Sequence, residues 1–106
     1  MIYTPKLLAN GALSDTPDST IYTADEEVTD ICTIIKEIII NNVTTGAVTV
    51  SLSIGGGVIF TDLPIQAKET KIYSLSTILN PGLLIEGSCS SGISAMFTIS
   101  GIRVAS

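Results

Sequence analysis

The chain has 106 residues and a formal charge of −5, and it contains no histidine, no tryptophan and a single arginine. This length fits one domain with its own hydrophobic core, and the lack of histidine excludes Ser-His-Asp and Cys-His catalysis. Nucleic-acid binding needs clustered basic residues, and the only close pair is Lys68 and Lys71, so DNA or RNA binding is not expected.

Neither export nor membrane insertion is expected. No apolar run approaches the roughly 18 residues that a spanning helix needs. The densest stretch, residues 34–40, contains Lys36 and Glu37. Residues 1–6 lack the charged region followed by an apolar region that marks a signal peptide. The 45% hydrophobic content with only 14% charge indicates that another subunit covers part of the apolar surface.

Residues 1–19 mix apolar residues with breakers. Leu7-Leu8-Ala9 favours a short strand, whereas Asn10-Gly11 and Thr16-Pro17-Asp18 are turn or loop signals. Two interpretations stay open: an arm that docks on a neighbouring protein, or the first strand of the chain's own domain. The domain proper is expected to cover residues 20–106.

The stretch from Val28 to Val43 is ambiguous between helix and strand. Its isoleucines have helical spacing, but the run is almost wholly β-branched, which suits a pleated sheet. It is preceded by a short β-branched and aromatic strand, residues 20–23, and an acidic turn, residues 24–27. It ends at Asn41-Asn42, before a clearly alternating segment. We therefore expect a strand here, joined to the next strand as a hairpin.

Alternation sets the faces of these two strands. In the first, Ile38 and Ile40 are predicted to point inward and Ile39 to the opposite face. In the second, the inward row is Val48, Val50, Leu52 and Ile54, and the outer row is Thr49, Ser51 and Ser53.

Further strands follow at intervals of eight to twelve residues. The predicted turns are Gly55-Gly56-Gly57, Pro64 with Ala67-Lys68-Glu69, Asn80-Pro81-Gly82 and Ser90-Ser91-Gly92. The last strand is expected to turn Ile93, Ala95, Phe97 and Ile99 to one face and Ser94, Met96, Thr98 and Ser100 to the other. This spacing predicts an all-β fold: a single antiparallel β-sandwich of the jelly-roll or immunoglobulin-like type, with seven or eight strands.

Candidate chemical sites are weak. The acidic residues Asp25, Glu26, Glu27 and Asp30 could hold a hard cation such as calcium, but they do not match an EF-hand loop, and a solvated acidic turn is the preferred interpretation. Residues 55–57 lack the Lys-Ser/Thr of a phosphate-binding loop. Cys32 and Cys89 are expected to be free thiols. We expect no catalytic residue, cofactor or metal site, and no enzymatic activity.

Tyrosines offer a binding alternative. Small β-sandwiches that bind sugars usually do so through exposed aromatic platforms, and Tyr3, Tyr22 and Tyr73 are the candidates. Tyrosines also lie at subunit contacts and core edges, which is the preferred interpretation here.

From about residue 20 to the end, the layout resembles small β-sandwich structural proteins of tailed bacteriophages. The segments that carry the resemblance are Ile21-Tyr22-Thr23, Ile35 to Asn42, Ala47 to Leu52, Lys68 to Lys71, Pro81 to Glu86, and Phe97 to Gly101. The chain departs from this pattern at residues 24–27, where such proteins often carry Pro-Ala-Gly.

The resemblance implies a non-enzymatic protein of the virion, of the head-decoration, head-fibre or tail-accessory type. Such proteins act through homo-oligomers, including trimers, and through docking on other virion proteins. They are made in the host cytoplasm. A carbohydrate- or receptor-binding module at a fibre tip is the alternative, with a host surface glycan as ligand. The expected interface residues are Tyr3, Leu7, Leu8, Tyr22 and Tyr73.

Overall fold

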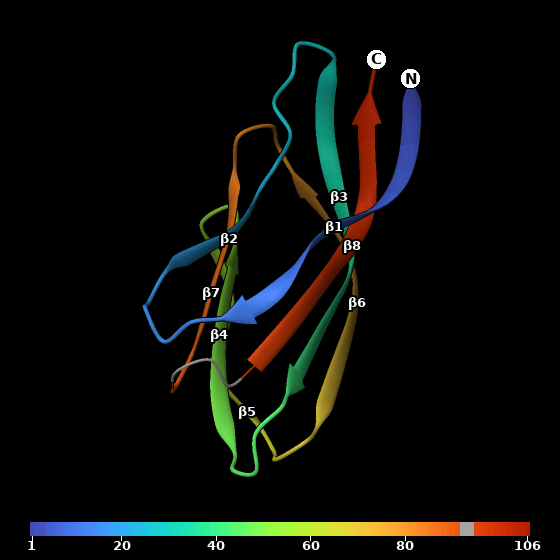
Figure 1. Cartoon of the computed structure of the whole chain (residues 1–106). Helices are drawn as coiled ribbons and strands as arrows, with labels where there is room; N and C mark the ends of the chain where they lie inside the picture. Colours follow the sequence, from blue (N-terminus) through green and yellow to red (C-terminus); the bar gives the residue numbers. More distant parts are fainter. Residues whose placement is uncertain (92–94) are drawn as a thin grey trace.

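The computed structural model describes residues 1–91 and 95–106. These residues form eight β-strands (Figure 1). The strands are β1 (Ile2–Leu13), β2 (Ser19–Thr23), β3 (Asp30–Asn42), β4 (Val48–Ile54), β5 (Gly57–Ile65), β6 (Thr70–Leu79), β7 (Leu84–Cys89) and β8 (Ala95–Ala105). The predicted all-β class is therefore confirmed. The β-branched run after residue 28 is strand β3, not a helix.

The strands form two four-stranded antiparallel sheets with the orders β1-β8-β3-β6 and β2-β7-β4-β5. Neighbouring strands within each sheet pair antiparallel. Among the connections between consecutive strands, only β4 to β5 stays within one sheet. This order is that of an eight-stranded jelly roll, which settles the choice left open between a jelly roll and an immunoglobulin-like sandwich.

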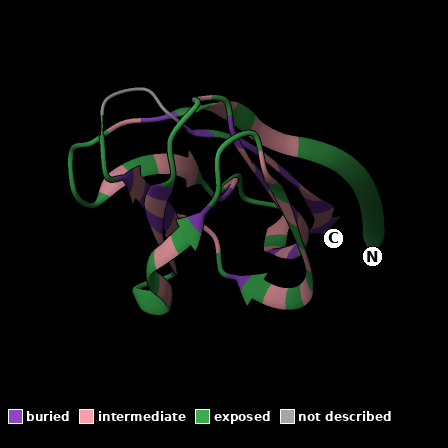
Figure 2. Ribbon diagram, turned by 90° about the horizontal axis from the view of Figure 1, so that it is seen from below, coloured by how far each residue is buried: buried purple, intermediate pink, exposed green. Residues whose placement is uncertain are grey.

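Strict alternation along the central strands builds the core. The side chains of Ile38 and Ile40 are buried while Ile39 between them is half-buried on the other face, as predicted. In β4 the inward row from Val48 to Ile54 is buried, also as predicted. The alternation is visible as colour banding along the strands in Figure 2. On β8, Ala95, Phe97 and Ile99 face the core. The prediction for Ile93 and Ser94, and for Gly92 in the turn, lies outside the described residues.

The hairpin predicted between β3 and β4 is wrong, because the two strands lie in different sheets. The residue that redirects the chain is Asn42, which is completely buried. Its Nδ2 donates to the carbonyl oxygens of Gly46 at 2.8 Å and Ile65 at 3.1 Å, and its Oδ1 accepts from the backbone N–H of Thr44 at 2.9 Å. A side-chain amide therefore organises the loop that carries the chain from one sheet to the other.

The turn predicted at Asn10-Gly11 is also wrong. Both residues lie inside β1, where Asn10 pairs with Thr98 and Gly11 with Phe97. A Cβ at Gly11 would make only an ordinary van der Waals contact with the ring of Phe97, at 3.7 Å, but the φ of 156° at this position is one that residues with a side chain rarely adopt. The predicted turns at residues 67–69 and 80–82 do lie between strands, as do Gly55 and Gly56, whereas Gly57 is already the first residue of β5. Pro64 instead lies within β5, which is an edge strand and tolerates proline.

Residues 2–13 therefore form the first strand of the chain's own sandwich. β1 pairs with β8 along its whole length, from Ile2 opposite Ala105 to Leu13 opposite Ala95. Leu13 is fully buried, whereas the first half of the strand is exposed. Of the two interpretations of the N-terminal segment, the structure supports the strand.

Candidate functional site

The outer face of the sheet β1-β8-β3-β6 carries a continuous row of apolar side chains. In an antiparallel pair, residues opposite each other point to the same side of the sheet. Pro5 lies opposite Ile102, Ile102 opposite Ile34, and Ile34 opposite Ile78. This row crosses all four strands on the side away from the buried Ile35. We call this surface the apolar face; its most exposed members are Tyr3, Leu7, Ile72, Ile78 and Met96.

Two of these side chains stand out at the edge strand β6. Ile72 is 61% exposed and Ile78 is 63% exposed. Single exposed apolar residues are ordinary on a protein surface, but a row that continues across four strands is not. The apolar face is therefore the strongest candidate for contact with another protein.

The other sheet turns a different surface to solvent. On its outer side, Ser51 lies opposite Ser88 and Ser53 opposite Glu86. A hollow of about 340 Å³ lies on this side, and its lining includes these four residues with Asp18, Thr61 and Asp62. Hydroxyl and carboxylate groups of this kind suit hydrogen bonds to a polar ligand.

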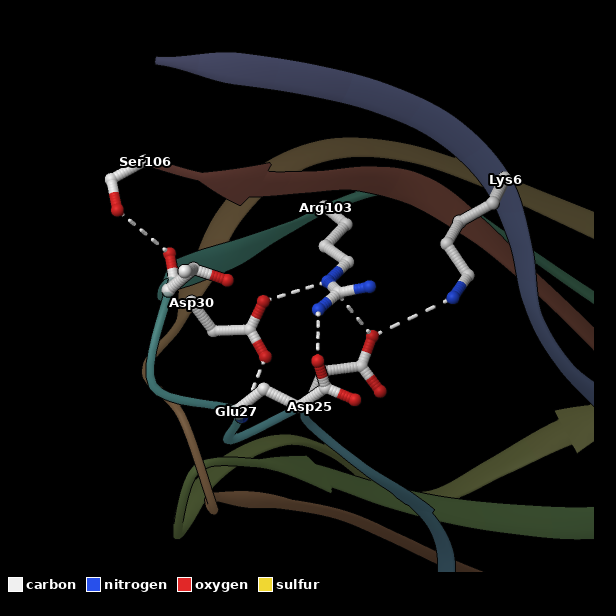
Figure 3. A network of polar contacts seen from close by, with 7 residues as sticks. Lys6, Asp25, Glu27, Asp30, Arg103 and Ser106 are labelled. Atoms are coloured by element: carbon white, nitrogen blue, oxygen red, sulfur yellow. Dashed lines mark hydrogen bonds and ion pairs between the residues drawn. The ribbon is translucent and has the colours of Figure 1, made fainter.

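A third cluster surrounds the only arginine (Figure 3). The Nε atom of Arg103 lies 2.7 Å from Oδ1 of Asp30 and 3.5 Å from Oδ2 of Asp25, and Nη2 lies 3.5 Å from Oε2 of Glu27. Lys6 adds a second cation, with Nζ 3.5 Å from Oδ2 of Asp25. Strands β8 and β1 thus supply the two cations that pair with the carboxylates of the loop between β2 and β3 and of Asp30.

The arginine changes the protonation of its main partner. The hydrogen bond from Arg103 holds the pKa of Asp30 below its ordinary value of 3.8, against the opposing effect of desolvation. A second hydrogen bond, 2.8 Å long, runs from the backbone N–H of Glu27 to Oδ2 of Asp30. The hydrogen bond to Asp30, together with the negative charges of Asp30, Asp25 and Glu27, raises the pKa of Arg103. The acidic run is therefore a structural ion-pair cluster, in which a guanidinium occupies the place considered for a cation.

The residues predicted for an interface fall into two groups. Tyr3 and Leu7 are 60% and 55% exposed, and both belong to the apolar face. Leu8, Tyr22 and Tyr73 are half-buried and pack against the core. The ring of Tyr73 lies 5.4 Å from that of Phe60 in the opposite sheet. Two of the three tyrosines considered as sugar platforms therefore support the sandwich itself.

Sequence reasoning missed Asn42 and Arg103. For Arg103, a signal was present: a chain with one arginine and an uncompensated acidic run needs that charge nearby. For Asn42 the neighbouring residues suggested only a turn. No disulfide joins Cys32 to Cys89, as predicted.

Among residues 1–91 and 95–106, no group of histidine, cysteine or acidic residues has the arrangement of a metal site. That part of the chain also contains no helix long and apolar enough to cross a membrane. Comparison with protein-family models gives no match, and comparison with curated protein sequences gives none either.

Proposed function

We propose that this chain is a non-enzymatic structural or accessory protein of a bacteriophage virion. It acts by forming homo-oligomers and by docking on other virion proteins, as a head-decoration, head-fibre or tail-accessory module. Two features support this proposal: the pattern of strands resembles such proteins, and the jelly roll is a recurrent architecture of viral capsid proteins. Fold alone does not establish function, so the proposal also needs a surface through which the chain can bind other proteins.

That surface is the apolar face. In a free monomer it leaves Tyr3, Leu7, Ile72 and Ile78 more than half exposed to water. Covering such a surface with another protein contributes roughly 25 cal/mol for each Å² of apolar area removed from water, against which the entropy cost of association is set. A module that works by packing needs this surface and no catalytic group.

Mass spectrometry of gradient-purified phage particles tests the location. We expect the chain in the particles at a fixed ratio to the major structural protein. A chain that is abundant in the lysate but absent from purified particles would contradict the proposal.

Attachment is tested with the double variant Tyr3→Ser, Leu7→Ser. Both positions are exposed, so the variant should fold but bind particles that lack the protein more weakly than the wild type does. Val58→Ser is the matched control, since Val58 is 70% exposed on the other sheet. Equal binding by the double variant and the control would remove these residues from the docking surface.

The hollow on the other sheet favours one second candidate, a glycan-binding module at a fibre tip. Its carboxylates and hydroxyls can hydrogen-bond sugar hydroxyls, with Asp62 and Glu86 as the charged acceptors. Titration with a panel of host surface glycans, followed by NMR of the labelled chain, tests it. Binding that disappears in Glu86→Gln would support this candidate, and an unperturbed spectrum with all glycans would exclude it.

A further inference from the structure

The four edge strands of the sandwich differ in how they avoid pairing with another chain. An open edge presents unpaired N–H and C=O groups, and proteins protect such edges with proline, irregular register, charge or short length. Strand β1 has Pro5 and a register shift, and β2 has only five residues with a register shift. Strand β5 has Pro64, two register shifts, and Asp62 in a left-handed conformation with φ of 51°.

Strand β6 shares one of these devices, a register shift between Ile35 and Glu37 in its pairing with β3, but it is not short and carries no charge in its central part. It runs for ten residues without proline and alternates between exposed and less exposed positions along its whole length. Its one charged residue, Lys71, lies near its start and pairs with Glu69 at 3.6 Å. It is the terminal strand of its sheet and pairs only with β3 among the described residues. The backbone N–H and C=O groups on this edge can therefore pair with another strand.

We propose that β6 pairs antiparallel with β6 of a second copy of this chain, joining two sheets into one eight-stranded sheet. Opposed residues must lie on the same face, which restricts the registers. With Leu75 opposite the second copy's Leu75, Ile72 meets the second copy's Ile78, and Ser74 meets the second copy's Ser76. Registers centred on Ser74 or Ser76 instead leave both isoleucines opposite a polar residue.

Charge complementarity supports the same register. The Nζ of Lys36 on β3 already reaches over β6, where it donates to Oγ of Ser76 at 2.7 Å. Glu37 lies opposite Ser74 in the β3–β6 pairing. In the Leu75-centred register, Ser76 faces the second copy's Ser74, so Lys36 and the second copy's Glu37 approach along one row. The twofold axis produces this pair twice, as an isologous contact requires.

This inference rests on the self-association in the proposed function and specifies its geometry. Light scattering and sedimentation velocity of the purified chain measure the association. Ile72→Lys places a charge on the exposed edge and should weaken the dimer at least about tenfold, a change of about 1.4 kcal/mol in association. Val58→Lys on the other sheet is the matched control and should leave the dimer intact.

A charge-swap series tests the register itself. Lys36→Glu and Glu37→Lys each place like charges on the shared row, so each should weaken the dimer. The double variant Lys36→Glu, Glu37→Lys restores opposite charges and should recover the association. Circular dichroism and thermal melting confirm that each variant is folded.

The outcomes separate the inference from the proposed function. A wild-type dimer that is unaffected by Ile72→Lys, with no recovery pattern in the swap series, overturns β6 pairing but leaves self-association through another surface. A wild-type chain that stays monomeric at every concentration overturns both β6 pairing and the homo-oligomer. Presence in virions, measured separately on particles, then decides whether docking on other virion proteins remains.

Discussion

At one end of β3, Asn42 is a neutral amide, fully buried, that ties the loop from β3 to β4 to the start of the β5–β6 connection. At the other end, Asp30 is a carboxylate that joins the loop from β2 to β3 to Arg103 on β8. Both ends use a polar side chain to hold a crossing between sheets. The two ends differ in charge. Low pH and high salt should therefore weaken the contribution of the Asp30 end to stability and leave that of the Asn42 end unchanged.

The largest loss of stability is expected from a substitution in the hydrophobic core. Val50→Asp places an unpaired charge at a fully buried position and should destabilise the fold by about 4 kcal/mol or more. Thr49→Asp, on the outer side of the same strand, should change the free energy of unfolding by less than about 0.5 kcal/mol. Urea titration of both variants measures this. Similar large losses would mean that the hydroxyl-lined side is also buried, for instance in an oligomer.

The neutral end comes next. Asn42→Leu keeps a similar volume but leaves the carbonyls of Gly46 and Ile65 without the amide donor, so we expect a loss of about 3 kcal/mol. The loss should be the same at neutral and acid pH, because no titrating group is involved. Asn41→Leu is the control, since Asn41 lies on the opposite face of the strand. A marked pH dependence of the Asn42→Leu effect would break the contrast between the ends.

Removal of the arginine at the charged end should have a smaller effect that depends on pH. Arg103→Met leaves Asp25, Glu27 and Asp30 close together without the guanidinium, so the melting temperature should fall at neutral pH. At acid pH the carboxylates become protonated and the difference from the wild type should shrink. Melting in a pH series, repeated at high salt, measures this. An unchanging difference would indicate that packing of the arginine stem, rather than charge, is lost.

The smallest effect on stability is expected from Asp30→Asn. A lowered pKa in the folded state means that the stabilisation from Asp30 is fully present above its ordinary value of 3.8 and is lost as the pH falls below it. The variant should therefore be slightly less stable than the wild type at neutral pH and should lose less stability on acidification. Melting curves on both sides of that pH test the sign. A variant that loses stability faster in acid would contradict the assignment of Asp30 as the responsive group.

Local alternation was enough to predict most of the strands and their faces, because a pleated strand with one buried side leaves a period of two in the sequence. It was enough for Ile38 to Ile40 and for β4. It did not reveal which strands are neighbours, since the residues that decide this act over long distances. Asn42 bonds to Ile65, and Gly11 pairs with Phe97. The apolar face was anticipated only through Tyr3 and Leu7, because Ile34, Ile78 and Ile102 align only after the sheet order is known.

The place of β8 within its sheet has a consequence for synthesis. Of the eight described strands, β8 is made after the others and lies between β1 and β3, so β1 has no neighbour in its sheet among the described residues until residues 95–105 have left the ribosome. Pairing strands that are so distant in sequence slows folding and prolongs the exposure of apolar strands in the nascent chain. This architecture therefore delays completion of the fold until its last strand has emerged, and during that interval chaperones have access to β1 and β3.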